Sequence, residues 1–172
     1  MCRYFSNESK CSDRLTHVDA AGKANMVSVG HKNLSKRSAT ASGKVFVGSK
    51  VAALIRSNSM KKGDVLTVAR IAGIQGAKRT SEMIPLCHNI FISAIKVDAA
   101  VEDTADSIII TATVESDGKT GVEMEALTAV TVAALTVYDM CKAVTHDIVI
   151  QDIKLMEKTG GVRGDFKRNS ED

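Results

Sequence analysis

Residues 119–142 read KTGVEMEALTAVTVAALTVYDMCK, and this stretch decides how the rest of the chain is organised. From Ala126 to Tyr138 it is rich in Ala, Val and Leu and carries no charge, which is typical of a helix in a protein core. Asp139 follows directly, and a carboxylate beside apolar residues needs a partner because burying an unpaired charge is costly. Lys142 is close enough along a helix to supply that partner. The stretch therefore predicts a core helix that ends either in a functional acid–base pair or in one structural ion pair.

The spacing of two acids on this helix constrains any shared site. Glu125 and Asp139 are fourteen residues apart, which corresponds to about 21 Å along a helix. They fall within about 40° of the same face. Two such groups cannot both contact one reacting atom. If both act in one site, they come from different subunits or hold opposite ends of a long substrate, so the spacing points to an inter-subunit site.

The composition is that of one globular domain with an aliphatic core. The chain has 172 residues, of which 44% are hydrophobic, 25% are charged and 3% are aromatic. The scarcity of aromatic residues disfavours a single-strand nucleic-acid binder, which needs stacking platforms. The net charge of +3 does not require a polyanionic partner, although local basic clusters can bind a small phosphorylated ligand.

Cysteine usage and the terminal sequence indicate the compartment only broadly. The four cysteines, Cys2, Cys11, Cys87 and Cys141, form no Cys-x-x-Cys pair, so we expect free thiols in a reducing compartment and no structural zinc. No uninterrupted apolar run is long enough for a membrane span. Residues 1–14 lack the apolar segment of a secretory signal and have too few basic residues to indicate a transit peptide.

Apolar periodicity predicts an α+β domain with an antiparallel sheet covered by helices on one face. We expect a flexible tail at 1–14, a single domain at 15–166 and a polar C-terminal tail at 167–172. The expected elements are a strand near 42–48, helices at 49–56 and 65–79, strands at 90–101 and 107–115, a helix at 121–144 and a strand at 147–156. Asp64 is the expected cap of the second helix, and Pro85 interrupts the chain after it.

Two motifs flanking the hairpin carry possible site chemistry. Gly118-Lys119-Thr120 resembles the end of a phosphate-binding loop, but Thr113 stands where the full motif requires glycine, so that motif is excluded. Lys119 either assists anion binding at the helix start or belongs to a simple turn. Cys87 and His88 are adjacent and should point to opposite faces, which disfavours a joint nucleophile–base or metal role. His88 alone is either a polar ligand contact or a structural histidine.

Basic residues flank the second predicted helix and the end of the chain. The four residues Lys61, Lys62, Lys78 and Arg79 form either a solvated face or an anion clamp. Residues 160–164 read GGVRG and are either a phosphate-contacting loop or a frayed tail. The composition of this segment favours the tail.

Seven blocks in order resemble the molybdenum cofactor biosynthesis protein C (MoaC) family, the cyclic pyranopterin monophosphate synthases. The resemblance extends from Leu15 to Phe166. The blocks are LTHVD at 15–19, KKGDV at 61–65, ARIAGIQ at 69–75, IPLCH at 84–88, KTGVEMEALT at 119–128, YDMCKA at 138–143 and KTGG at 158–161. The family usually has proline after Cys-His, whereas this chain has Asn89.

This resemblance implies a fold, an assembly and a reaction. The implied fold is ferredoxin-like α+β with additional N-terminal elements, assembled as a homohexamer, a trimer of dimers with sites between subunits. The implied enzyme is a lyase that converts cyclised dihydro-GTP, the product of a radical enzyme, to cyclic pyranopterin monophosphate and pyrophosphate in molybdenum cofactor (molybdopterin) biosynthesis. It implies no cofactor, metal ligand, nucleic acid or membrane partner, and it leaves open whether the reaction needs a divalent metal. The implied compartment is the cytoplasm in a bacterium and the mitochondrial matrix in a eukaryote.

Carried over residue by residue, the resemblance also implies roles. Asp139 and Lys142 match the catalytic acid–base pair, and Lys62 matches a general acid or phosphate clamp. The substrate-contacting positions are Leu86, Cys87, His88, Glu123, Met124, Glu125 and Lys158. Lysines and carboxylates suit proton transfer, and cations stabilise a departing pyrophosphate.

A second hypothesis is a non-catalytic nucleotide-binding or scaffolding subunit, which a ferredoxin-like fold would also allow. Such a subunit would be expected to lose at least one of the polar positions that the resemblance marks. All of them are present: Lys62, His88, Glu125, Asp139 and Lys142.

Overall fold

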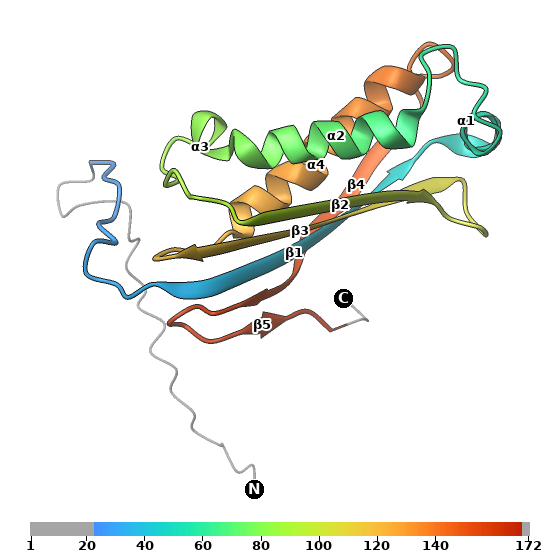
Figure 1. Cartoon of the computed structure of the whole chain (residues 1–172). Coiled ribbons are helices and arrows are strands. Elements are labelled where there is room, and N and C mark those ends of the chain that lie inside the picture. Colours follow the sequence, from blue (N-terminus) through green and yellow to red (C-terminus); the bar gives the residue numbers. More distant parts are fainter. Residues whose placement is uncertain (1–22, 170–172) are drawn as a thin grey trace, which may run out of the picture.

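The computed structural model of the chain describes residues 23–169, in which helices cover one face of an antiparallel sheet (Figure 1). The elements, in chain order, are β1 (Ser35–Phe46), α1 (Gly48–Arg56), α2 (Val65–Lys78), α3 (Thr80–Met83), β2 (Ala94–Val101), β3 (Ser107–Gly118), α4 (Glu123–Cys141), β4 (Val149–Thr159) and β5 (Phe166–Lys167). The predicted tail at residues 1–14 and the predicted domain start at Leu15 lie outside the described residues.

The strand order confirms the ferredoxin-like architecture. The sheet runs β2-β3-β1-β4-β5, and each neighbouring pair is antiparallel. The connection from β1 through α2 to β2 and the connection from β3 through α4 to β4 interleave, which is the split βαβ arrangement. Both connections place their long helix on the same face of the sheet (Figure 1). The short strand β5 adds an edge to the four long strands.

Small residues bring α4 close to the sheet. Along β1 alternate positions are buried, and Ala39, Ala41 and Val45 face the helices. A Cβ atom at Gly43 would come within 2.7 Å of the side chain of Val130 in α4. By length and composition α4 would be able to cross a membrane, but more than half of it is buried in this fold, so it is a core helix.

The helices α2 and α4 pack closely and run in opposite directions. A Cβ atom at Gly73 would lie 2.9 Å from the carbonyl oxygen of Ala129, and one at Gly76 would lie 2.8 Å from the side chain of Val132. Glycine at these two positions therefore permits close helix packing. Because the helices are antiparallel, the turn that precedes α2 lies at the C-terminal end of α4 (Figure 1).

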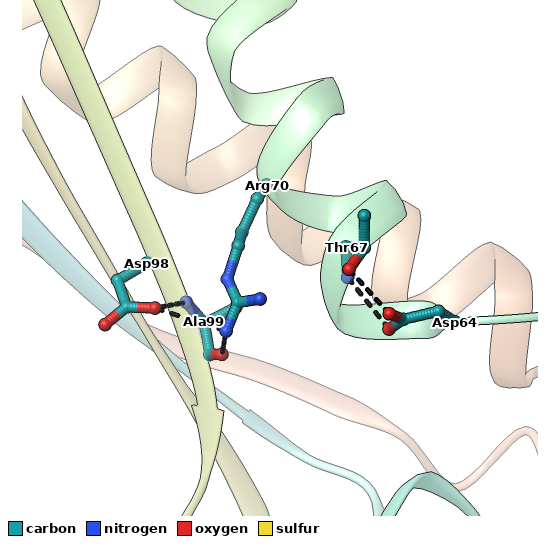
Figure 2. A network of polar contacts seen from close by, with 5 residues as sticks. All are labelled: Asp64, Thr67, Arg70, Asp98 and Ala99. Atoms are coloured by element: carbon teal, nitrogen blue, oxygen red, sulfur yellow. Dashed lines mark hydrogen bonds and ion pairs between the residues drawn. The ribbon is translucent and has the colours of Figure 1, made fainter. Parts of the chain in front are cut away.

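The start of α2 is fixed by polar contacts that Figure 2 shows. Asp64 accepts hydrogen bonds from the backbone nitrogen of Thr67 at 3.0 Å and from its hydroxyl group at 2.6 Å. This confirms Asp64 as the helix cap. Arg70 donates to the carbonyl oxygen of Ala99 at 2.6 Å and pairs with Asp98 at 3.3 Å, which ties α2 to β2.

Several predicted boundaries were wrong. The first strand begins at Ser35 rather than Ser42. The prediction missed its first half because the inward positions there carry Ala and Arg instead of the large apolar residues that mark a strand. The helix expected at 121–144 is the shorter α4, and the strand expected at 90–101 begins at Ala94. The short helix α3 was not predicted.

The segment near the C-terminal end of the chain forms a hairpin rather than a frayed tail. Gly160 and Gly164 have φ angles of +80° and +81°, a backbone region that favours glycine. They allow the chain to reverse, and β5 then pairs with β4, with Lys158 opposite Phe166. Composition alone favoured a tail because glycine and charged residues are also typical of disordered ends.

Candidate active site

A cavity of about 580 Å³ lies at the N-terminal end of α4. Its walls come from residues before β1, from Arg37, from the segment after α3, from the turn into α4, and from β4 with the following loop. The predicted substrate-contacting residues that line it are Leu86, Cys87, His88, Glu123, Met124 and Lys158. Segments far apart in the sequence therefore meet at one hollow.

The lining of the cavity is strongly cationic. Its basic side chains are Lys32, Arg37, Lys119, Lys158 and Arg163, together with the imidazole of His88. Among the described residues, Glu123 is the one carboxylate that lines it, and its Oε1 lies 3.2 Å from the Nζ of Lys158. The excess of positive charge favours a ligand with several negative charges.

Arg37 is a site residue that the sequence analysis missed. It is only 5% exposed, it lines the cavity, and its Nε has no hydrogen-bond partner among the described residues. Buried polar groups are nearly always hydrogen-bonded, and a buried cation without an anion is costly. The sequence offered one signal for it: Arg37 alternates with Ala39 and Ala41 along β1, so its charged side chain lies on the buried face of the strand.

Glu125 lies directly behind the cavity wall and is the buried carboxylate of α4. It is 2% exposed, its Oε1 accepts a hydrogen bond from the Sγ of Cys87 at 3.8 Å, and its Oε2 has no partner within the described chain. Burial raises the pKa of Glu125. Burial and the nearby carboxylate of Glu125 raise the pKa of Cys87 to about 11. Cys87 is therefore a neutral thiol, poorly suited to act as a nucleophile.

The adjacent side chains of Cys87 and His88 have separate partners, in agreement with the expectation that they point apart. The thiol contacts Glu125, whereas the Nε2 of His88 donates to the carbonyl oxygen of Val27 at 2.8 Å. Lys119 reaches the cavity from the turn before α4, and its Nζ donates to the carbonyl oxygen of Gly30 at 2.6 Å. The Gly118-Lys119-Thr120 segment thus contributes a cation to the cavity without forming a phosphate-binding loop of the P-loop type.

A second polar cluster lies at the other end of α4. The carboxylate of Asp139 bridges two ammonium groups, with Lys142 at 2.7 Å from Oδ1 and Lys62 at 2.9 Å from Oδ2. Lys62 also donates to the carbonyl oxygen of Asp139 at 2.8 Å. The hydrogen bonds from Lys142 and Lys62 lower the pKa of Asp139 to about 2, and Asp139 in turn raises the pKa of Lys142.

The ion pair that was expected between Asp139 and Lys142 is therefore present. The side chain of Asp139 is 57% exposed because it lies on the open face of α4, whereas the next two residues, Met140 and Cys141, are buried on the other face. Of the four basic residues that flank α2, only Lys62 joins this cluster. Lys61, Lys78 and Arg79 are exposed elsewhere, so the four do not form a single anion clamp.

The cavity lies at the N-terminal end of α4 and the cluster at its C-terminal end. Figure 1 shows the course of this helix. Glu125 and Asp139 are separated by about 21 Å along α4. One chain therefore does not bring all the predicted catalytic and substrate-contacting residues together. Within residues 23–169, no group of three or more His, Cys, Asp and Glu side chains is placed to hold a metal ion.

The fold and these two polar regions define a class: a ferredoxin-like α+β protein with a cationic cavity and a separate lysine–aspartate–lysine cluster. The chain belongs to the MoaC family, whose sequence profile matches residues 26–161.

Relatives in this family fall into two size groups. The chain is 61% identical to molybdenum cofactor biosynthesis protein 1 of Drosophila melanogaster over 155 residues, which is 90% of this chain and 27% of that protein. It is 53% identical to the Homo sapiens protein of the same name over 91% of this chain and 25% of that protein. It is also 55% identical to cyclic pyranopterin monophosphate synthase of Streptomyces coelicolor, over 91% of both chains. The chain thus spans about a quarter of the animal relatives and nearly all of the bacterial one.

Proposed function

We propose that this protein is a cyclic pyranopterin monophosphate synthase, a lyase of molybdenum cofactor biosynthesis. Its substrate is a cyclised dihydro-GTP supplied by a radical enzyme, and its products are the cyclic pyranopterin phosphate and pyrophosphate. The proposal is supported by family membership and by the similarity to the Streptomyces synthase over nearly the whole of both chains. The structural observation that carries it is the cationic cavity with the buried, unpartnered Nε of Arg37.

The cavity suits the phosphate end of this substrate. A nucleoside triphosphate carries several negative charges, and within residues 23–169 the cavity presents five Lys and Arg side chains against the single carboxylate of Glu123. These cations would stabilise the charge that develops on pyrophosphate as it leaves. A guanidinium can bind two phosphate oxygens at once, which suits Arg37 to a phosphate group.

The cluster of Lys62, Asp139 and Lys142 suits the proton transfers of ring opening and rearrangement. Asp139 is ionised at neutral pH because its pKa lies at about 2, and it holds two ammonium groups within 2.9 Å. We assign proton donation and acceptance to this cluster, with Asp139 and Lys142 as the acid–base pair. The neutral thiol of Cys87 and the buried Glu125 shape the opposite part of the site.

We further propose that each complete site joins the cavity of one subunit to the cluster of a partner subunit. Leu135 is an exposed apolar side chain on α4 between the two polar regions, and Met124 is a second exposed apolar side chain at the cavity end of the helix. If two copies of α4 pair in opposite directions about a twofold axis, the start of one helix faces the end of the other. A homodimer would then form two complete sites, and three dimers would form the proposed hexamer.

The proposed reaction is tested by incubating the purified protein with cyclised dihydro-GTP. Phosphorus NMR and mass spectrometry should detect equimolar pyrophosphate and a cyclic phosphate product. Tight binding of the substrate without turnover would instead support the second hypothesis, a non-catalytic nucleotide-binding subunit. Failure to bind the substrate would contradict both functions.

A further inference from the structure

Residues 26–33 form a segment without helix or strand that leads into β1 (Figure 1, blue), and we call this segment the strap. Val27, Val29 and Lys32 of the strap line the cavity. Much of the rest of the strap is exposed, including Met26 and Gly30. A segment with so little buried surface opens at low free-energy cost unless specific contacts hold it.

Two side chains from separate parts of the cavity wall hold the strap. His88, in the segment after α3, donates from its Nε2 to the carbonyl oxygen of Val27 at 2.8 Å. Lys119, in the turn before α4, donates from its Nζ to the carbonyl oxygen of Gly30 at 2.6 Å. A turn within the strap, with the backbone nitrogen of Lys32 donating to the carbonyl oxygen of Val29 at 3.1 Å, connects these anchors to Lys32.

We propose that the strap is a lid, that His88 and Lys119 are the positioning residues that latch it, and that latching carries Lys32 to a bound polyanion. The proposal rests on the proposed function only in taking a phosphate-bearing ligand as the occupant of the cavity. Lys32 reaches the cavity wall only through the strap, so strap closure and anion binding stabilise each other. Such coupling is reciprocal, so a bound anion must also protect the closed strap.

The latch itself is tested without ligand by hydrogen–deuterium exchange of peptides that cover residues 26–33. Lys119→Met and His88→Ala each remove one anchor and should raise exchange of the strap about tenfold, since Lys119→Met loses a hydrogen bond from a charged group and His88→Ala loses a partly buried one. Lys158→Met is the matched control, because Lys158 lines the same cavity but pairs with Glu123. If both anchor variants exchange like the wild type, or if Lys158→Met loosens the strap equally, the latch does not exist.

The role of Lys32 is tested by the affinity for pyrophosphate, measured by calorimetry in a double-mutant cycle. If Lys32 acts through the latched strap, Lys32→Met should weaken binding several-fold in the wild type and have almost no effect in the Lys119→Met background. If the two lysines act as independent charges, their effects should multiply, as we expect for the control pair Lys32→Met and Lys158→Met. Multiplying effects in the Lys119 cycle, or no binding of pyrophosphate by the wild type, would overturn this role.

These measurements separate the lid from the proposed reaction. Strap exchange and pyrophosphate affinity are measured without turnover of the cyclised dihydro-GTP. If the strap is latched but the protein does not turn over that substrate, the lid proposal is supported and the proposed synthase activity is contradicted. If the protein is an active synthase but the strap is not latched, the proposed function is supported and the lid proposal is contradicted.

Discussion

The Nζ of Lys62 lies 2.9 Å from the Oδ2 of Asp139, although 77 residues separate them in the chain. Antiparallel packing of α2 on α4 brings the turn before α2 to the end of α4. In that turn Gly63 has a φ angle of +92° and Asp64 caps the helix, so the backbone beside Lys62 is well defined. The fold therefore builds the lysine–aspartate–lysine cluster from two helix ends rather than from one sequence motif.

Replacing Asp139 by Asn should lower turnover by about 10²- to 10⁴-fold, the usual loss when a group involved in proton transfer is removed. The carboxylate of Asp139 raises the pKa of Lys142, so its removal lowers that pKa. The alkaline limb of the remaining pH–rate profile should therefore move to lower pH. Asp98→Asn, which removes a carboxylate paired with Arg70 at 3.3 Å on β2, is the control and should keep normal turnover. Near-normal turnover of Asp139→Asn, with an unchanged alkaline limb of the pH–rate profile, would show that Asp139 takes no part in proton transfer.

Replacing Arg37 by Met should make the ligand-free protein more stable and should abolish the additional stability that pyrophosphate gives the wild type. The substitution removes a buried cation that lacks a partner at its Nε, so the free energy of unfolding should rise by about 1–3 kcal/mol. At the same time, stabilisation by added pyrophosphate should be lost, because ligand binding raises stability only where the ligand binds. Thermal unfolding with and without pyrophosphate measures both effects. The control is Lys96→Met on β2. An Arg37→Met variant that is less stable than the wild type and is still stabilised by pyrophosphate would contradict the prediction.

Replacing Glu125 by Gln should change how stability depends on pH. The pKa of Glu125 is raised in the folded protein, so its protonated form favours folding at low pH and this contribution is lost as pH rises through the folded pKa. Gln cannot ionise, so the variant avoids that loss. We expect the variant and the wild type to be similar near pH 4 and the variant to be more stable by about 1–3 kcal/mol near pH 7.

Urea unfolding at fixed protein concentration across this pH range measures the difference for Glu125→Gln. Glu115→Gln provides a control on a carboxylate that is solvent-accessible in its pair with Lys36. A stability difference that stays constant between pH 4 and pH 7 would show that folding does not raise the pKa of Glu125.

The sequence predicted those parts of the fold where large apolar residues recur at a regular interval. The helices α2 and α4 and the hairpin of β2 and β3 all have such patterns, and Asp64 marks a helix start by ordinary capping chemistry. The first half of β1 was missed because its inward positions carry Arg37, Ala39 and Ala41, which are weak strand signals. The strand β5 was missed because its pairing depends on a turn at Gly160 and Gly164 and on contact with β4.

The candidate site was predicted less completely, for a physical reason. Glu125 and Asp139 lie on nearly the same face of α4, yet one is 2% exposed and the other has a side chain that is 57% exposed. Helical periodicity gives a residue's direction around the axis, but not which elements cover each part of the helix. The partnerless Nε of Arg37 likewise follows from tertiary packing, which residue spacing alone does not determine.

The proposed inter-subunit site predicts that two inactive chains restore activity when mixed. Glu125→Gln damages the cavity end of α4, and Asp139→Asn damages the cluster end, about 21 Å away. In a mixed dimer, one site receives the intact cavity of one chain and the intact cluster of the other. Random mixing in equal amounts makes about half of the dimers mixed, each with one complete site of two, so recovery should approach about a quarter of wild-type activity.

The subunits must be co-expressed or dissociated and reassembled, and each variant must be inactive alone. A matched control mixes Glu125→Gln with Lys158→Met, whose defects both lie at the cavity end of the chain. Every site in that mixture carries a damaged cavity, so no recovery is expected, whereas recovery there would indicate some other form of exchange. If native mass spectrometry confirms mixed oligomers of Glu125→Gln and Asp139→Asn without recovered activity, the two residues do not act in one site formed by different subunits. The exposed apolar side chains on α4 would then need a role other than aligning two halves of a site.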